Sequence, residues 1–223
     1  FASEGRKQPK ERQVIAAVLA GSWSEAAWNQ PQVELDFFDG KGLLENLIRE
    51  LCVQKARFKV LSPEQAPWLQ PGRAAEILAG SKHLGWLGEV HPLACEAFGA
   101  AAPVVAFELD LKSVISVAEA ARLFKDVPQY PAVDIDLALV VDEQVTAERV
   151  EQVLRSAAGA RLDELRLFDV YRDVEKVGEG KKSLAFSLSY RAADRTLTSE
   201  EVELVHQKVI RKVKGAIGGE VRS

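Results

Sequence analysis

The sequence lacks methionine, has only two cysteines and contains no long apolar run. A helix that crosses a bilayer needs roughly 20 consecutive apolar residues, so no membrane span is expected. No basic segment followed by an apolar one opens the chain, which excludes a recognisable secretion signal. Cys52 and Cys95 are too few for a disulfide scaffold, and we expect reduced thiols and a cytoplasmic location. Because translation begins at methionine, its absence favours a piece of a longer polypeptide.

The chain also lacks a large excess of charge of either sign. A net charge of −4 over 223 residues excludes a protein that coats nucleic acid or membrane by bulk charge, and leaves a local basic site open. Hydrophobic residues make up 47% and charged residues 28%, which is typical of a globular chain rather than a disordered one. The length favours one large domain or two small ones.

Two prolines, Pro128 and Pro131, indicate where the chain divides. The residue before a proline is disfavoured in a helix, so residues 126–131 are predicted to form an extended linker. The proposed domains are then residues 1–125 and 132–223. Charge does not distinguish them, whereas the periodicity of apolar residues does.

The first domain is predicted to be a mostly antiparallel sheet with a helix or two. Leu43, Leu44, Leu47, Ile48 and Leu51 recur at helical spacing, with Asp39 as the expected N-cap and Cys52 on the buried face. A short helix is expected over residues 91–98. Strands are expected at residues 12–19, 56–61 and 104–109, with a hairpin formed by 74–78 and 84–90.

The second domain shows clearer patterns. Residues 133–141 alternate apolar and polar side chains as a strand does, and Thr146 and Gly159 bound a helix. Two strands follow, at residues 165–172 and 184–190. Thr198 and Glu201 form a capping box that starts another helix, and residues 220–222 favour an edge strand. The order strand, helix, strand, strand, helix, strand is that of the ferredoxin-like fold, and the predicted class is α+β.

One face of this predicted sheet has the chemistry to bind a flat ligand. Ser183, Ala185, Ser187 and Ser189 are all small, and they share the strand face opposite the core. Tyr171 and Asp169 are two residues apart, so their side chains project from one face. A tyrosine ring stacks on a base and a carboxylate accepts the N1 and N2 hydrogens of guanine, as in single-stranded RNA recognition. A tyrosine and an aspartate near a strand end are also common without any such role.

Basic residues gather on the last predicted helix. They form either the ordinary solvated face of an amphipathic helix or a set of backbone phosphate contacts. The residues concerned are Lys208, Arg211, Lys212 and Lys214. Arg222, on the predicted edge strand, is a further candidate for a phosphate contact.

Catalytic and metal-binding patterns are missing. The three histidines have no cysteine or carboxylate at the spacing of metal ligands. No serine lies in a nucleophile elbow, and residues 178–182 form a turn rather than a phosphate-binding loop. We therefore predict no catalytic residue and no metal ligand.

Four motifs in order make the second domain resemble the anticodon-binding domain of the bacterial phenylalanyl-tRNA synthetase β subunit. They are Tyr130–Val141, Leu167–Tyr171, Gly180–Phe186 and Arg195–Thr198 with the two glutamates that follow. The first domain is similar to the inactive, class II synthetase-like module of the same subunit. Its matching motifs are Leu19–Gly21, Asp36–Gly42, Pro71–Ala75 and Leu84–Pro92.

The resemblance implies a tetramer of two α and two β subunits that joins phenylalanine to tRNA(Phe) with ATP and magnesium. Catalysis would belong to the α subunit, against which the first domain would pack, and this chain would hold no complete active site and no cofactor of its own. Tyr171 would stack on the first anticodon base, a guanine, and Asp169 would read its edge. Ser183, Ala138 and Arg222 fall where the family has further anticodon contacts.

A different class of protein fits the residue pattern of the second domain. A ferredoxin-like domain can bind a small regulatory ligand and dimerise through its sheet without touching nucleic acid. The serine-rich face would then be buried in a homodimer.

Overall fold

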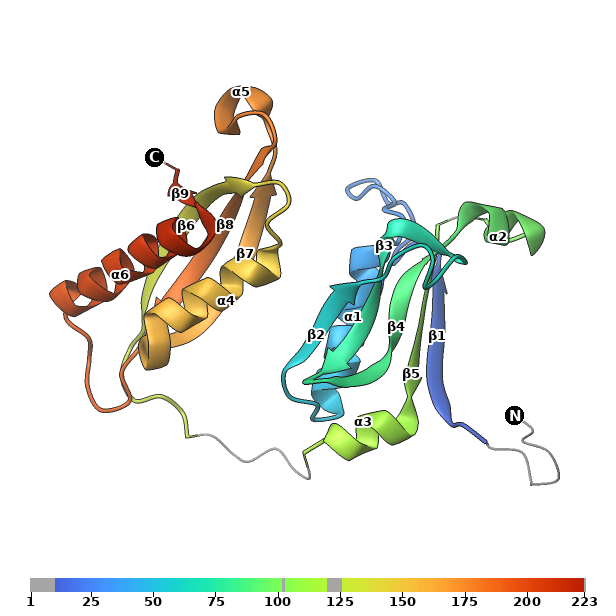
Figure 1. The fold of residues 1–223 in the computed structure, drawn as a ribbon, viewed down its shortest axis with the longest axis horizontal. Coiled ribbons are helices and arrows are strands. Elements are labelled where there is room, and N and C mark those ends of the chain that lie inside the picture. Colours follow the sequence, from blue (N-terminus) through green and yellow to red (C-terminus); the bar gives the residue numbers. More distant parts are fainter. Residues whose placement is uncertain (1–10, 102, 120–125, 223) are drawn as a thin grey trace. The chain divides into compact units, whose positions relative to one another are not determined.

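The computed structural model describes residues 11–101, 103–119 and 126–222. The chain divides into two compact units, Phe1–Phe124 and Lys125–Ser223, and each is described here by itself (Figure 1). Residues 126–131, the predicted linker, form neither helix nor strand. Within the described ranges, no helix is both long and apolar enough to cross a membrane.

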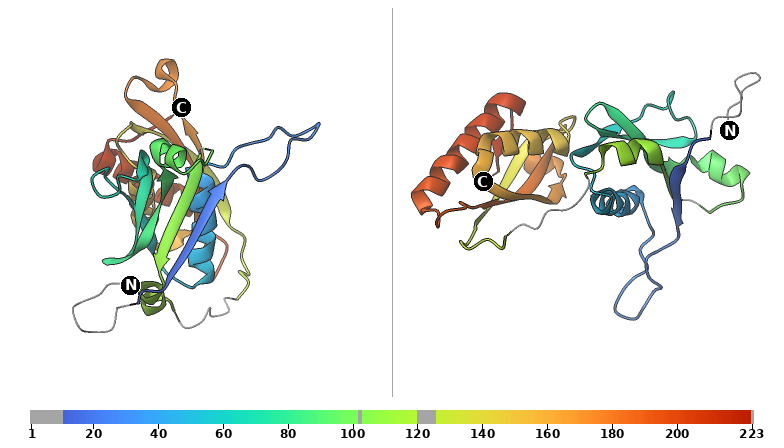
Figure 2. Two further views of the ribbon diagram at one scale, coloured as in Figure 1. Left: turned by 90° about the vertical axis from the view of Figure 1, so that its right-hand side faces the viewer. Right: turned by 90° about the horizontal axis from the view of Figure 1, so that it is seen from below.

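The first unit is built on a five-stranded antiparallel sheet, as predicted. Its strand order is β1-β5-β4-β3-β2, and every neighbouring pair is antiparallel. The strands are β1 (Val14–Ala20), β2 (Ala56–Val60), β3 (Leu69–Ala79), β4 (Lys82–Val90) and β5 (Val104–Asp110). The helices are α1 (Phe37–Glu50), α2 (Pro92–Ala97) and α3 (Leu111–Val117). Figure 2 shows α1, in blue, against one face of this sheet.

Helix α1 begins earlier than its apolar pattern predicts. Asp36 is the N-cap, and Asp39 lies three residues later, where its side chain accepts the Asp36 N–H at 2.8 Å. The prediction that Asp39 is the N-cap was therefore wrong, because the two aspartates form a reciprocal capping box. Cys52 was also misplaced: it follows the helix with φ 56° and is partly exposed, whereas Cys95 is buried.

Helix α1 lies unusually close to the sheet at one glycine. A Cβ atom on Gly40 would lie 2.4 Å from Cγ1 of Val105, which is fully buried in β5. Leu44 and Ile48, one and two turns further on, complete the buried stripe of the helix. Leu47 and Leu51 are partly buried against the same core, but Leu43 is exposed. The apolar stripe predicted from the sequence is therefore confirmed except at Leu43, and Gly40 sets how near the helix comes to the strands.

The second unit has the ferredoxin-like order of elements. Its strands are β6 (Val133–Asp142), β7 (Leu162–Tyr171), β8 (Lys181–Tyr190) and β9 (Glu220–Val221), in the sheet order β7-β8-β6-β9. The helices are α4 (Ala147–Ala158), α5 (Val174–Val177) and α6 (Ser199–Ile217). Figure 1 shows α4 and α6 on the same side of the sheet. The predicted caps Thr146 and Thr198 are confirmed, while α3 and α5 were not predicted.

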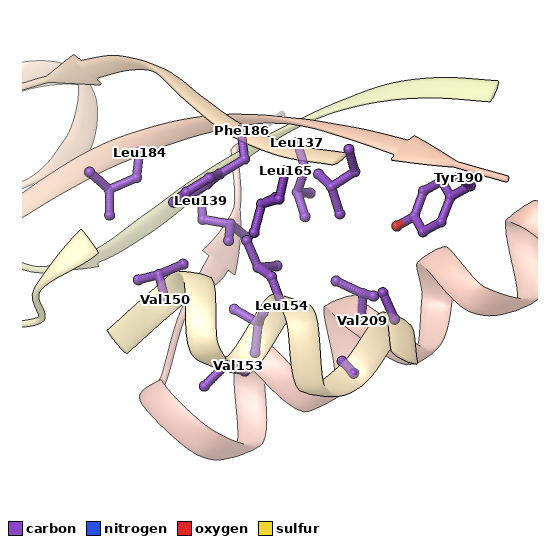
Figure 3. Close-up of a cluster of buried hydrophobic side chains, with 14 of the residues drawn as sticks. Leu137, Leu139, Val150, Val153, Leu154, Leu165, Leu184, Phe186, Tyr190 and Val209 are labelled. Carbon is purple, nitrogen blue, oxygen red and sulfur yellow. The ribbon is translucent and has the colours of Figure 1, made fainter. Parts of the chain in front are cut away.

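The core of the second unit fills the space between this sheet and helices α4 and α6 (Figure 3). Strand β8 contributes four fully buried residues at alternate positions, from Leu184 to Tyr190. Val150 and Leu154 of α4 and Val209 of α6 pack against them. Alternation along β6 and β8 therefore leaves the other face of the sheet to the small and polar side chains, as predicted.

Candidate nucleic-acid interface

A bulge in β7 brings the predicted pair, Asp169 and Tyr171, onto the face away from the helices. Leu167 lies opposite Phe186, a core residue, but Asp169 lies opposite Ala185 and Tyr171 opposite Ser183. Phe168 is the extra residue and is 50% exposed. If β7 had no bulge, strict alternation of the same sequence would put Asp169 and Tyr171 on the side of Leu167, facing the core.

The bulge was not predicted, although the sequence carries a signal for it. Apolar residues occupy odd positions at Leu165 and Leu167, then even positions at Phe168 and Val170. Such a change of phase inside one strand indicates an inserted residue. Reading that shift would have placed the pair on the correct face from the sequence.

All five residues that the resemblance points to lie on this one face. A row across the sheet runs from Asp169 through Ala185 and Ala138 to Arg222, whose N–H donates to the Ala138 carbonyl at 2.9 Å. The next row pairs Tyr171 with Ser183. Ala185 and Ala138, in the middle of the first row, have short side chains and so leave space above the sheet between Asp169 and Arg222.

The ring of Tyr171 is the centre of a polar cluster. Its hydroxyl donates to Oδ2 of Asp173 at 2.7 Å. The guanidinium carbon of Arg222 lies 4.8 Å from the ring centroid, and Nζ of Lys176 lies 5.8 Å from it. Asp173 and Lys176 were not predicted, because they belong to the segment 172–180, for which no periodic pattern was available.

Hydrogen bonding with Tyr171 favours the charged forms of Asp173 and Lys176. The hydrogen bond from Tyr171 holds the pKa of Asp173 below its ordinary value. Hydrogen bonding to Tyr171 raises the pKa of Lys176, although the nearby Arg222 opposes that shift. Asp173 is therefore an anion and Lys176 a cation at neutral pH, and Tyr171 lies between groups of both signs.

The predicted stripe of small residues is less open than expected. Ser183 is only 3% exposed, whereas Ala185, Ser187 and Ser189 are partly exposed. Ser183 lies directly opposite Tyr171, whose larger side chain occupies the neighbouring space. A flat ligand on this face would therefore meet the alanine row before it met the Ser183 hydroxyl.

The basic residues of α6 lie away from this cluster. Lys208, Arg211, Lys212 and Lys214 are exposed on the helix that covers the opposite face of the sheet. Lys212 also donates to Oγ of Ser156 in α4 at 2.7 Å. The structure thus does not bring these four cations together with Tyr171.

In the first unit, a pocket contains an ion pair between Arg73 and Glu89. Asp36, Arg73 and Glu89 line a shallow pocket, where Arg73 Nη1 lies 2.5 Å from Glu89 Oε1. Glu89 also accepts the Phe37 N–H at 3.1 Å, and its contact raises the pKa of Arg73. Across the described part of the chain, no group of three or more His, Cys, Asp and Glu side chains could hold a metal ion.

Comparison with known proteins matches both units. Residues 1–111 match the family model of the phenylalanyl tRNA synthetase beta chain CLM domain, and residues 128–222 that of the ferredoxin-fold anticodon binding domain. The phenylalanine–tRNA ligase β subunit of Symbiobacterium thermophilum is 43% identical over 220 residues, or 99% of this chain. The chain belongs to the phenylalanine–tRNA ligase β-subunit family.

Other members of the ligase β-subunit family match over almost the same length. The β subunit of Moorella thermoacetica is 38% identical over 222 residues and that of Halalkalibacterium halodurans 36% identical over 217. The chain spans 24% of the S. thermophilum protein and 27% of the M. thermoacetica protein. It therefore corresponds to about a quarter of these ligase β subunits.

Proposed function

We propose that the second unit binds the anticodon loop of tRNA(Phe) through the sheet face around Tyr171. The observation that carries this proposal is the β7 bulge, which turns Asp169 and Tyr171 onto the face that Ala138, Ser183 and Arg222 share. The family match of residues 128–222 supports it independently.

Each residue of this face would make a different contact with the RNA. The ring of Tyr171 stacks on the first anticodon base, a contribution of about 1–3 kcal/mol. The carboxylate of Asp169 accepts hydrogen bonds from N1 and N2 of a guanine. Ala138 and Ala185 leave room for the base, and Arg222 contacts the RNA from the edge of the sheet.

The phosphate contacts proposed for α6 need a second surface. Lys208, Arg211, Lys212 and Lys214 lie on the opposite side from Tyr171, so one short loop on the sheet face does not meet them. A longer RNA that passes around the unit is required for them to contribute. Lys176, which lies beside the Tyr171 ring, is a nearer candidate for a phosphate contact.

At the scale of the enzyme, we propose that this chain acts within a tetramer of two α and two β subunits in the cytoplasm. The first unit would support the α subunit during ATP-dependent aminoacylation of tRNA(Phe). Magnesium has no candidate ligand cluster among the residues that the structure describes, and we assign no step with ATP or magnesium to them. The alternative, a ferredoxin-like dimer that binds a small regulatory ligand, lacks the support of the family match.

The test is binding of the 223-residue chain to an RNA hairpin that carries the tRNA(Phe) anticodon loop. We expect Tyr171→Ala to weaken binding by about tenfold or more, from the loss of stacking, with little change in stability. The matched control is Tyr130→Ala, which removes a partly buried tyrosine outside the sheet. Unchanged affinity in Tyr171→Ala would contradict the proposal. A chain that sediments as a dimer, and as a monomer when Tyr171 is changed to alanine, would contradict it too.

A further inference from the structure

We propose that Asp173 is a positioning residue that holds the ring of Tyr171 in place for stacking. The inference deepens the proposed function and rests on it. Oδ2 of Asp173 accepts the Tyr171 hydroxyl at 2.7 Å, while Oδ1 accepts the N–H of Glu175 at 3.0 Å and that of Lys176 at 3.3 Å. One carboxylate therefore ties the ring to the backbone of the α5 turn.

The α5 turn is itself fastened to the sheet. Val177, its last residue, is 6% exposed, and α5 packs on β8, the strand opposite Tyr171. The linkage runs from the buried Val177 through the cap at Asp173 to the hydroxyl of Tyr171. A ring held in this way loses less conformational freedom when a base stacks on it, which improves affinity without a new contact to the RNA.

Charge alone would give Asp173 the opposite effect. A carboxylate beside Lys176 and Arg222 offsets two cations that would attract RNA phosphates. If Asp173 acted only through its charge, its removal would tighten RNA binding, and more so at low salt. The positioning role predicts weaker binding, so the two interpretations differ in sign.

The test uses variants that separate the cap from the hydroxyl contact. Asp173→Ser keeps a good N-cap for α5 but has a single oxygen, and so loses the acceptor of the Tyr171 hydroxyl. Tyr171→Phe keeps the stacking ring, changes no charge and loses the donor. We expect each variant of the full chain to bind the anticodon hairpin about three- to tenfold more weakly.

The double variant decides whether the two residues act through one contact. In the Tyr171→Phe background, Asp173→Ser is expected to cause no further loss of affinity, because the hydroxyl that it held is already gone. Additive losses, or tighter binding by Asp173→Ser in the wild-type background, would overturn the positioning role.

A measurement without RNA keeps this inference separate from the function on which it rests. NMR titration of the Asp173 carboxyl should show a higher pKa in Tyr171→Phe than in the wild type, because the hydrogen bond that lowers it is removed. If neither the wild type nor any variant binds the anticodon hairpin more tightly than a hairpin with adenine in place of the first anticodon guanine, the proposed function fails. If the Asp173 pKa does not respond to Tyr171→Phe, the positioning role fails whatever the RNA does.

Discussion

Arg222 and Tyr171 come from opposite edges of the second unit's sheet, yet their side chains meet above it. Strands β9 and β7 are the outermost in the order, and the guanidinium lies 4.8 Å from the ring centroid. An exposed cation–π contact contributes about 0.5–1 kcal/mol, whereas base stacking contributes about 1–3 kcal/mol. In the proposed complex, a stacked base would therefore displace Arg222 from the ring, and the guanidinium would then be available to the RNA backbone.

That exchange predicts a change in salt dependence. Affinity for RNA falls as salt rises, so the slope of log affinity against log salt is negative. If Arg222 contacts a phosphate, Arg222→Ala should make this slope shallower by about 0.7. Arg149→Ala, on the helix-covered side, removes the same charge and should leave the slope unchanged. The measurement is hairpin affinity of the full chain over a salt series. An equal slope for Arg222→Ala and wild type would show that this arginine meets no phosphate.

At the scale of elements, the N-terminus of α6 depends on one ionised carboxylate. Glu201 receives two bonds of 2.6 Å from the Arg195 guanidinium and accepts the Thr198 N–H. The Arg195 bonds, chiefly, lower the pKa of Glu201 from an ordinary 4.5 to about 2. A carboxyl whose pKa is lower in the folded state stabilises it above the ordinary pKa, and that stabilisation is lost as the pH falls through the lowered one.

We therefore expect α6 to lose protection against hydrogen exchange as the pH falls from 4.5 toward 2. Glu201→Gln should be less protected than the wild type above this range and should show a smaller loss within it. Exchange measured by mass spectrometry on α6 peptides, corrected for the intrinsic rate at each pH, checks this. An identical pH profile for the variant would refute the role of the carboxylate.

Two glycines of α1 provide a matched pair for the packing of the first unit. Gly40→Ala would place a Cβ 2.4 Å from Val105, and should cost about 1–3 kcal/mol through overpacking. Gly42→Ala meets no atom within 4 Å, and should stabilise the helix by about 0.5–1 kcal/mol. Urea unfolding followed by tryptophan fluorescence measures both. Equal effects of the two changes would contradict the close approach of α1 to β5.

Elements with a regular period or a clear cap could be predicted from the sequence. The alternation of residues 133–141 and the capping box at Thr198 are examples, and both are confirmed. The turn α5 could not, because four residues are too few to show a helical period. Tyr171 and Asp169 were identifiable by type and resemblance, but Asp173 became visible only when the structure placed its carboxylate against the Tyr171 hydroxyl.

At the scale of the whole molecule, each unit has its own hydrophobic core. The four tryptophans lie in the first unit and the three tyrosines in the second, so the two can be followed separately. We expect two separable unfolding transitions in urea, with Gly40→Ala shifting the tryptophan signal and leaving the exchange protection of α6 unchanged. A single transition, with both probes moved by Gly40→Ala, would show that the units unfold together.

The most direct test of the central claim compares two RNA hairpins with the full chain at two salt concentrations. One carries the anticodon loop of tRNA(Phe), and the other has the first anticodon guanine replaced by adenine. Asp169 and Tyr171 predict tighter binding to the guanine loop at both salts, with the preference lost in Tyr171→Ala. Equal, salt-sensitive binding to both loops would mean phosphate contact alone, and would contradict base recognition on this face.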